Sequence, residues 1–507
     1  MPALIRAMAL SAAALCFSPA PARAQGFVEA RTADGVVVQE SCVPPFAGAP
    51  AFLPCETAAK RAADVITRLS AVLGPFPVKK LKLEIASITD EAPRNYLVAI
   101  PGRISGGWDI YPYLGSPMDR RDLLPREIAR QWFEPYYPPA ASGPRWLAES
   151  LAEYLAWRYL NEAEPEAGRV LVMEAMRDVP AWELPRPPLP TGKRHSDTLF
   201  PEIVAMRRHG LLVLRTLETV IDRERVDRVL PLLIRRSGGN PPSVELLEKV
   251  CEEVAGRNLK WFFDYYVEGN GIPSIELRRL ASESPGVAAG EIVVKGLPPE
   301  GSVRVEMAVR TAQGAIAHSV ATRGGVTPFS VNVPAPALSI TLDPDQRILR
   351  WTEAAERWKA QSAVLAELPE PITAKNLAAA IDLYRCALAA DPNDASQRAQ
   401  ALRERLGELE WAHDEWNVAL ADLDAAINGH SISPFETYLC RGKAYLYHGV
   451  VQLHERRPKE ALEDAKSGLA LPREALSQSM PERPIESHGN QTLEQLLQTL
   501  VEAATHY

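Results

Sequence analysis

The chain has 507 residues, of which 46% are hydrophobic and 24% are charged, so it can bury several apolar cores and is expected to form about three domains. Its formal charge is −8, and it contains no run rich in lysine or arginine. This distribution argues against a nucleic-acid-binding protein, so we expect no nucleic acid among its partners.

The first 24 residues have the layout of a signal peptide. Arg6 precedes an apolar stretch over residues 7–17, and residues 22–24 (ARA) form the small-residue pattern that precedes a cleavage site. The apolar stretch is too short to anchor the chain in a bilayer, and no later stretch is long enough to span one. We therefore expect cleavage after Ala24, a mature charge near −10, and a periplasmic or secreted protein without a membrane span.

The cysteines allow one disulfide prediction, because an exported protein can form such bonds. Cys42 and Cys55 flank a short loop rich in proline and alanine, and we predict a bridge between them. Cys251, Cys386 and Cys440 are each set in an apolar helical pattern. That setting favours buried, unpaired thiols.

Strand signals come first along the chain and helical patterns follow. Residues 25–55 look irregular or strand-like, with a short β-segment at 35–38, and residues 81–85 (LKLEI) alternate as a strand. The pattern then becomes chiefly helical up to about residue 280. A proline-rich loop at 180–190 interrupts it.

Residues 126–130 (REIAR) have the layout of the H-E-x-x-H helix of zinc peptidases, with an arginine at each histidine position. In that motif two imidazoles at i and i+4 bind one Zn²⁺ on one helix face, and the intervening Glu acts as general base. A guanidinium stays charged at any working pH and has five N–H donors but no lone pair to offer a cation. Arg126 and Arg130 therefore cannot serve as zinc ligands.

Three further segments match the same kind of enzyme. Residues 146–154 (WLAESLAEY) resemble the W-L-N-E-G-F-A-x-Y helix of the aminopeptidase-N-like gluzincins, whose Glu is the third zinc ligand. Residues 261–273 (WFFDYYVEGNGIP) resemble the W-F-F-x-x-W-x-x-G-x-G-x-P stretch that closes their catalytic domain, and residues 73–77 (LGPFP) resemble their F-G-x-Y-P segment. Four motifs in the family's order give a resemblance that covers roughly residues 30–350.

The resemblance assigns roles to the matching positions. Glu127 takes the position of the general base, and Glu149 takes that of the zinc-ligating carboxylate. Eighteen residues separate Arg130 from Glu149, which is the spacing that the family keeps between its second histidine and its third ligand. Arg126 and Arg130 occupy the two histidine positions, so the resemblance implies a peptidase domain with a degenerate zinc site.

Two other family motifs are altered. Residues 207–210 (RRHG) match the family's Y-x-K-G, so Arg207 replaces the tyrosine that stabilises the tetrahedral intermediate. No G-x-M-E-N precedes the helix, and residues 106–109 (GGWD) are the nearest match. Because that motif binds the free amine of the substrate in the family, aminopeptidase specificity is in doubt independently of the metal.

The sequence offers no second metal motif. The nine histidines include no pair at i, i+3 or i+4, and the cysteines form no C-x-x-C. We therefore expect no cofactor, with zinc held by distant residues as the alternative. His209, a lone histidine beside two arginines, is expected at a surface or an interface.

The two arginines have two possible arrangements. Arg126 and Arg130 share a helix face, and the family fold would set that face against Glu149 and Glu153, which are also spaced i, i+4. Guanidinium groups bound to these carboxylates would then take the place of Zn²⁺ in a buried charge network. In the other arrangement the arginines point into solvent. Trp132, Trp146 and Leu147 mark an apolar environment nearby, which favours the buried network.

The last two regions differ from the helical part. Residues 286–350 contain period-2 runs at 302–306 and 329–333, which predict a small β-sandwich. Beyond it, similar helical segments at 380–388, 419–423 and 461–465 recur at intervals of 39 and 42 residues. These intervals exceed the 34 residues of a tetratricopeptide repeat, so the helices are either tetratricopeptide-like pairs or a bundle that caps the sandwich.

These regions together predict a multidomain α+β protein. We expect a signal peptide over residues 1–24, a thermolysin-like, mainly helical gluzincin domain over 25–280, a β-sandwich over 281–351 and an α-helical tetratricopeptide-like domain over 352–507. The favoured function is that of an exported, non-catalytic pseudopeptidase that binds peptide or protein partners.

Two other functions remain open at this stage. One is an active zinc aminopeptidase with atypical ligands. The other is a metal-free enzyme that uses Glu127 and Glu149 as an acid/base pair, which requires two carboxyl groups with well-separated pKa values. The neighbouring arginines argue against it, because they should keep both carboxylates ionised.

Overall fold

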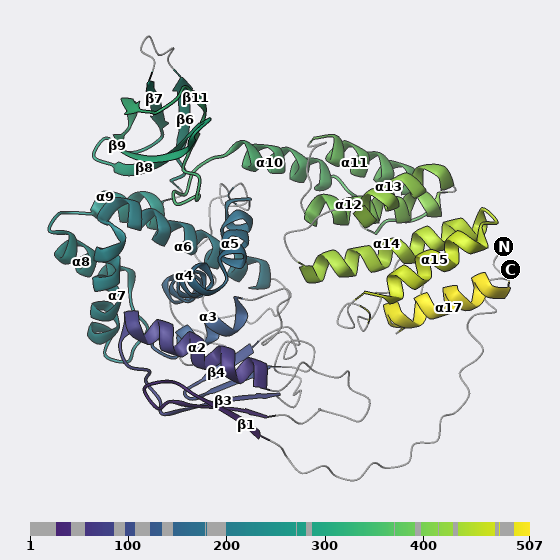
Figure 1. The fold of residues 1–507 in the computed structure, drawn as a ribbon, viewed down its shortest axis with the longest axis horizontal. Coiled ribbons are helices and arrows are strands. Elements are labelled where there is room, and N and C mark those ends of the chain that lie inside the picture. The colour runs from purple at the N-terminus through teal and green to yellow at the C-terminus, as the bar shows by residue number, and fades with distance from the viewer. Residues whose placement is uncertain are drawn as a thin grey trace. The chain divides into compact units, whose positions relative to one another are not determined.

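The computed structural model of the chain describes residues 27–41, 56–85, 97–106, 122–133, 146–177, 179, 199–269, 271–279, 286–369, 371–390, 397–413, 415–428, 434–471, 476 and 491–506. The fold is multidomain α+β (Figure 1). The described residues divide into two compact units. The first unit contains residues Gly26–Val43 and Leu53–Lys359, and the second contains Ala360–Tyr507. The predicted disulfide between Cys42 and Cys55, the signal peptide and residues 107–109 lie outside the described residues.

The first unit begins with a five-stranded mixed sheet in the order β1-β2-β3-β5-β4. Its strands are β1 (Phe27–Arg31), β2 (Val37–Ser41), β3 (Lys80–Ile85), β4 (Leu97–Ile100) and β5 (Arg103–Gly106). The strand predicted at 81–85 is confirmed as part of β3. The segment predicted at 35–38 starts too early, because Gly35 adopts a φ of +82° in the turn before β2. The sheet is covered by α2 (Glu56–Leu73), which packs against β1 and β2.

Helices follow this sheet and form a large part of the core of this unit. They are α3 (Leu123–Arg130), α4 (Trp146–Ala163), α5 (Pro165–Arg177), α6 (Leu199–Ile221), α7 (Arg223–Ser237), α8 (Val244–Ala255), α9 (Lys260–Phe262) and the π-helix η4 (Phe263–Glu268). α4 lies at the centre, since every residue from Trp146 to Leu160 is buried and α4 packs against α3, α5 and α6. A helix buried on all sides must pair its polar side chains internally.

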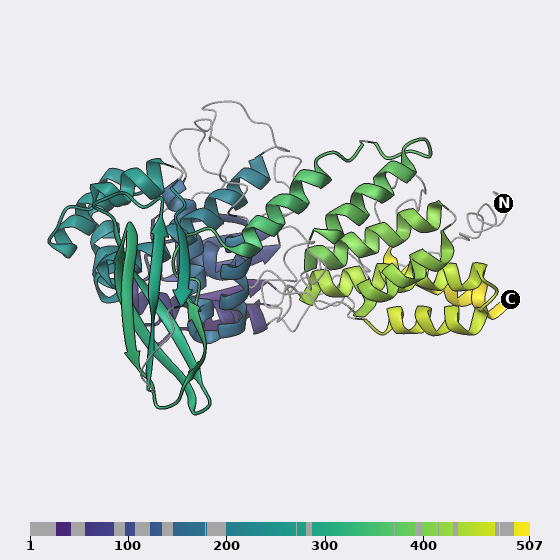
Figure 2. The same ribbon diagram turned by 90° about the horizontal axis from the view of Figure 1, so that it is seen from above.

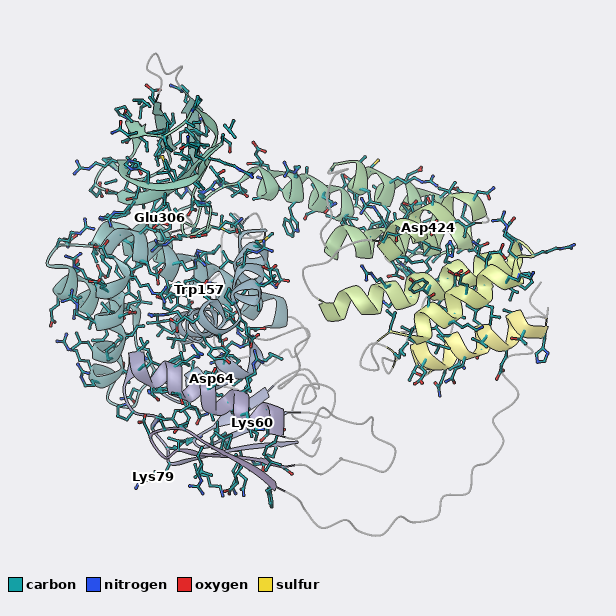
Figure 3. All side chains as sticks on the ribbon, viewed as in Figure 1. Lys60, Asp64, Lys79, Trp157, Glu306 and Asp424 are labelled. Atoms are coloured by element: carbon teal, nitrogen blue, oxygen red, sulfur yellow. The ribbon has the colours of Figure 1, made fainter. Side chains whose placement is uncertain are left out.

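The carboxyl-terminal half of α4 shows such pairing. Tyr154 donates its hydroxyl hydrogen to Glu218 Oε1 at 2.6 Å, and the guanidinium of Arg215 lies 4.2 Å from the centroid of the Trp157 ring. Figure 3 labels Trp157 within this part of the unit. Burial lowers the pKa of Arg215 to about 10, which leaves it charged at neutral pH. Arg215 and Glu218 both belong to α6, so these contacts tie α6 to α4.

Two three-stranded antiparallel sheets follow the helices. One has the order β10-β7-β6 and the other β11-β8-β9. Their strands are β6 (Ser274–Arg279), β7 (Val287–Lys295), β8 (Ser302–Thr311), β9 (Gly314–Arg323), β10 (Gly325–Asn332) and β11 (Ala337–Leu342), and Figure 2 shows them as long ribbons. Burial alternates along β8, as the period-2 pattern at 302–306 predicts. The first sheet starts at Ser274, because β6 pairs with β7 along its whole length.

A turn after β11 joins the sheets to the helices of the same unit. Asp343 is buried and has a φ of +46°. Its carboxylate accepts the backbone N–H groups of Arg347 at 2.7 Å and Ile348 at 3.2 Å. The next residue, Leu349, donates its N–H to Thr216 Oγ1 on α6 at 2.8 Å. Asp343 therefore fixes the backbone of residues 347–348, and the following N–H of Leu349 binds Thr216 of α6.

The second unit is built from helices that pack on their neighbours along the chain (Figure 1, Figure 2). After α10 (Glu353–Leu365), which crosses the division between the units, they are α11 (Leu377–Ala389), α12 (Gln397–Ala412), α13 (Trp416–Asn428), α14 (Pro434–His454), α15 (Pro458–Leu469) and α17 (Leu493–His506). The segments predicted at 380–388, 419–423 and 461–465 are helical, within α11, α13 and α15. α12 and α14 also contact each other. A tetratricopeptide-like arrangement stays a prediction.

The two cysteines whose state the structure gives are both free, but only one is buried. Cys251 is buried in α8 as expected, whereas Cys386 is exposed, so the prediction of a buried thiol was wrong there. α11 buries Leu377, Ala380, Ile381 and Ala387 on one side, and Cys386 lies off that side. Among the residues that the structure describes, every helix is too short or too polar to cross a bilayer.

We predict that Asp343→Ala lowers the stability of the first unit by about 2–3 kcal/mol, because it leaves the buried N–H of Ile348 and the partly buried N–H of Arg347 without an acceptor. Equilibrium urea unfolding of the full chain measures this change. Asp345→Ala is the matched control, since the Asp345 side chain is exposed in the same turn and only its backbone oxygen binds Arg215. An unchanged midpoint for Asp343→Ala would contradict the role of this turn.

Candidate functional site

Three helices of the first unit bring together the charged residues that the sequence singles out. α3 is short and wholly buried, and the i, i+4 spacing of Arg126 and Arg130 places both guanidinium groups on one of its faces. α4 carries Glu149 and Glu153 at the same spacing. α6 carries Arg207. Because α3 packs against α4 and α4 packs against α6, these side chains meet in the interior.

Arg130 contacts two carboxylates at once. Its Nη2 lies 2.5 Å from Glu149 Oε2, and its Nε lies 3.1 Å from Glu127 Oε2. The Arg130 side chain is 0% exposed, and those of Glu127 and Glu149 are 3% and 1% exposed. The guanidinium therefore points into the interior rather than into solvent. Without water around these ions, each charge depends on its partner.

Arg126 joins α3 to the second glutamate of α4. Its Nε donates to Glu127 Oε1 at 3.2 Å, and its Nη1 donates to Glu153 Oε2 at 3.3 Å. Nη1 also donates to Asp122, the residue before α3. Burial by itself would lower the pKa of Arg126, but the charges of Asp122 and Glu153 outweigh burial and raise the pKa above its ordinary value. Arg126 thus remains a cation.

Arg207 binds the same oxygen as Arg130. Its Nε donates to Glu149 Oε2 at 2.5 Å, so two guanidinium groups share one carboxylate oxygen. The other oxygen, Glu149 Oε1, is buried and accepts no hydrogen bond from the part of the chain that the structure describes. Burial alone would raise the pKa of Glu149, but the charges of Arg130 and Arg207 hold the pKa at about 2. Glu149 is therefore ionised at every working pH.

Glu153 is in a different electrostatic position. Burial raises its pKa in spite of the nearby charge of Arg126. The cluster contains four carboxyl groups, those of Asp122, Glu127, Glu149 and Glu153, and the three guanidinium groups of Arg126, Arg130 and Arg207. With all seven ionised it has one net negative charge. A proton on Glu153 would make the cluster neutral, and the raised pKa of Glu153 favours binding of that proton.

Close approach of α4 and α6 makes the contact of Arg207 possible. A Cβ atom at Gly210 would lie 1.7 Å from Ser150 Oγ and 2.9 Å from Ser150 Cα, so any larger residue would push the helices apart. Ser150 follows Glu149 on α4, and Gly210 lies one helical turn after Arg207 on α6. The two helices thus approach each other closely beside their ion pair.

His209 was expected at a surface or an interface, and that expectation was wrong. The residue is 2% exposed, and Trp146 Nε1 donates to its Nδ1 at 3.3 Å. It lies next to Gly210, where α6 comes close to Ser150 of α4, so the packing of two helices covers it. A single histidine after two arginines gives no sequence signal for such burial.

Two members of this region were not found from the sequence. Asp122 lies i−4 from Arg126, a spacing that could have indicated the pair, but it falls outside the motif. Glu174 on α5 binds Arg208 Nη2 at 2.9 Å, at the edge of the cluster where both side chains are partly exposed. Its partner is 34 residues away, and only the folded chain brings the two together.

Comparisons with known proteins support the fold and leave the family open. No model of a protein family matches the chain, and no curated protein matches its sequence. The crystal structure of Legionella pneumophila aminopeptidase A in complex with aspartic acid matches it with a TM-score of 0.51 at 12% identity, over 90% of this chain. The match covers 59% of the length of that protein. The chain therefore has an aminopeptidase-like fold, which at this identity says nothing further about its activity.

The side chains present do not fit the zinc ion that the aminopeptidase-like fold suggests. Two of the three positions expected to hold the metal carry guanidinium groups, which are cations without a lone pair. The third, Glu149, already binds both Arg130 and Arg207. Over the described ranges no group of three histidine, cysteine, aspartate or glutamate side chains is placed to hold a metal ion.

We predict that Arg130→Ala destabilises the first unit by roughly 3–5 kcal/mol, because it leaves two buried carboxylates without their shared cation. The midpoint of urea unfolding measures the loss. Arg68→Ala is the control, since Arg68 pairs with Asp64 on the surface of α2 and such a pair contributes only about 0–1 kcal/mol. A midpoint that barely moves for Arg130→Ala would mean that the cluster is hydrated in solution.

Proposed function

We propose that this chain is an exported, non-catalytic pseudopeptidase of the aminopeptidase-like gluzincin type and that it binds peptide or protein partners. One observation carries the proposal. Arg130 contacts both Glu127, at the position of the general base, and Glu149, at the position of the third zinc ligand. Both groups that zinc-dependent hydrolysis would require are thus held in ion pairs inside the protein.

Charge replacement explains how the fold tolerates the change. In the family, one Zn²⁺ supplies two positive charges beside two carboxylates. Here Arg126 and Arg130 supply two positive charges at the positions of the two histidines, and they bind Glu127, Glu149 and Glu153. The guanidinium groups offset the cost of burying those carboxylates, but they offer no Lewis acid to polarise a carbonyl group or to activate water.

The remaining groups are also unsuited to hydrolysis. Arg207 stands where the family has its tyrosine, and its Nε is bound to Glu149 rather than free to face a developing oxyanion. A metal-free mechanism with Glu127 and Glu149 would need one protonated and one ionised carboxyl group. Glu149, with a pKa of about 2, does not carry the proton.

Binding is the function that such a chain can still perform. A fold that has lost its catalytic groups keeps its shape and its surfaces, and stacked helices offer extended surfaces for peptides or partner helices. The helices from α11 to α17 form such a stack in the second unit. We therefore place partner binding on this unit, outside the cytoplasm as the signal-peptide pattern suggests.

The zinc site can be tested by repair. The wild-type chain should hold no stoichiometric zinc after mild dialysis, and Arg126→His combined with Arg130→His should bind one zinc through the new imidazoles and Glu149. This double variant should hydrolyse peptides poorly, and adding Arg207→Tyr should raise the rate by about 10²-fold or more. Elemental analysis and a peptidase assay provide the measurements.

Two controls make the repair experiment specific. Each single histidine variant should bind zinc weakly, and adding Glu149→Gln to the double variant should remove most of its zinc affinity. One tightly held zinc per wild-type chain, together with peptide hydrolysis, would instead establish an active aminopeptidase with atypical ligands. If the double variant turned over peptides at the same rate with and without Arg207→Tyr, the residue at position 207 would not contribute to catalysis.

We also predict that a chain lacking residues 360–507 stays folded and loses most of its partners. The first unit has its own core, including the two sheets and the turn at Asp343. Circular dichroism tests its folding, and pull-down from an extract of the source cell's envelope compares its partners with those of the full chain. Retention of the same partners would place the binding surface on the first unit.

A further inference from the structure

His448 lies between two carboxylates from two different helices. Its Nδ1 is 2.8 Å from Asp464 Oδ2 on α15, and its Nε2 is 3.5 Å from Asp424 Oδ1 on α13. His448 itself belongs to α14 and is 8% exposed, and Asp424 lies on the surface of the second unit (Figure 3). One imidazole therefore connects three helices.

The chemistry of the ring decides which form makes both contacts. A neutral imidazole has one N–H donor and one lone pair, so it can donate to only one of two carboxylates. The imidazolium donates from both nitrogens. A neutral ring would direct a lone pair at the remaining carboxylate, so the contact of three helices is complete only when His448 carries the extra proton.

A second contact of α13, between its Asp422 and Glu410 of α12, also needs a proton. Glu410 on α12 has a fully buried side chain, and its Oε1 accepts from Arg385 Nη2 on α11 at 2.7 Å. Its Oε2 is buried and receives no donor from the residues that the structure describes. Asp422 on α13 lies within hydrogen-bonding reach of the same carboxyl group. Two carboxyl groups form a hydrogen bond only when one of them holds a proton.

Both contacts involve α13, at Asp422 on one side and at Asp424 on the other. We propose that α13 (Trp416–Asn428) is a pH-sensitive joint of the helical stack: one proton between Glu410 and Asp422 fastens it to α12, and one proton on His448 fastens it to α14 and α15. At about pH 6 both protons are bound and the stack is closed. As the pH rises through about 7 for Glu410 and through the raised pKa of His448, both protons are released and α13 packs less tightly against its neighbours.

The surroundings of the two groups set the direction of the change. The charged groups around Glu410 and Asp422 are Arg385 on α11, Arg403 on α12, and His413 and Glu415 before α13. The charged groups around His448 are Asp424 and Asp464. Where α14 faces α12, the hydroxyl of Tyr447 donates to Glu408, which is paired with Arg405. Burial raises the pKa of Glu410 to about 7 against the opposing hydrogen bond of Arg385.

The two titrations act in the same sense. Burial alone would lower the pKa of His448, but its hydrogen bond to Asp464 and the charge of Asp424 raise it. Its contribution to stability is therefore complete below the ordinary pKa of about 6.5 and is lost as the pH rises through the raised value. The pKa of Glu410 is also raised, so Glu410 binds its proton more tightly in the folded stack than in the unfolded chain. Its contribution to stability therefore declines as the pH rises through about 7.

Hydrogen exchange of the full chain, followed by mass spectrometry, tests the joint. After correction for intrinsic rates, amides of α13 should exchange about tenfold faster or more at pH 8 than at pH 6, since a shift of one pKa unit changes an equilibrium tenfold. Amides of α2 are the internal reference, because α2 contains no histidine and its Arg68–Asp64 pair lies on the surface. Equal corrected exchange of α13 at the two pH values would overturn the proposal.

Two variants separate the contacts. Glu410→Gln supplies a permanent N–H donor toward Asp422, so α13 exchange at pH 8 should slow toward its value at pH 6. His448→Gln removes the ring but leaves the proton between Glu410 and Asp422, so α13 at pH 6 should exchange faster than in the wild type at pH 6 and more slowly than in the wild type at pH 8. His454→Gln is the matched control, as an exposed histidine beside Glu455 on the same helix, and should leave the pH dependence unchanged.

An NMR titration of His448 in the wild-type chain tests the proposal independently of whether His448→Gln folds. The ring should titrate above pH 6.5. A value at or below 6.5, or a pH dependence of α13 that persists in the Glu410→Gln, His448→Gln double variant, would overturn the joint.

Discussion

The ion pair of Arg130 with Glu127 and Glu149 is the constraint on which the first unit depends. α3 can be buried along its whole length only if its charges are met from other helices, and an unpaired ion in such a place would cost several kcal/mol. α4 supplies the carboxylates of Glu149 and Glu153, and α6 supplies Arg207. The register of three helices is thus set by charge as well as by apolar packing, and the glycine at position 210 allows the distance that the charges require.

The two units use different chemistry for the same task of joining helices. In the first unit the cations are guanidinium groups, which keep their charge at any working pH, and they hold the pKa of Glu149 at about 2. In the second unit the groups that bridge helices include His448 and Glu410, whose pKa values are both raised, that of Glu410 to about 7. The contacts of Glu149 with Arg130 and Arg207 should therefore be insensitive to pH, whereas the packing of α13 should depend on it. The difference follows from the side chains that bridge the helices, since both units bury polar groups between helices.

The sequence was informative where a fixed spacing determines geometry. The i, i+4 pairs 126/130 and 149/153 predicted which side chains share a helix face. The resemblance to the peptidase family, rather than spacing, set the two faces against each other. Alternation predicted β3 and β8, which bury one side. It did not predict β4 and β5, which have four residues each and too few positions for a pattern. Nor could spacing predict that Arg207 shares an oxygen with Arg130, that packing covers His209, or that α11 leaves Cys386 outside its buried side, because each depends on contacts between distant segments.

Under the proposed function, in which Arg126 and Arg130 stand where the family has two histidines, the two arginines are best understood as a single change. Arg126 and Arg130 both contact Glu127, and Arg130 also contacts Glu149. A zinc ion held by one histidine and Glu149 would lie beside a guanidinium group, and repulsion between the two cations in a buried site would oppose binding of the metal. Without zinc, one arginine and one neutral histidine would leave the carboxylates short of a positive charge. Two arrangements supply two positive charges to the same carboxylates. One is a metal ion held by two imidazoles, and the other is two guanidinium groups without a metal.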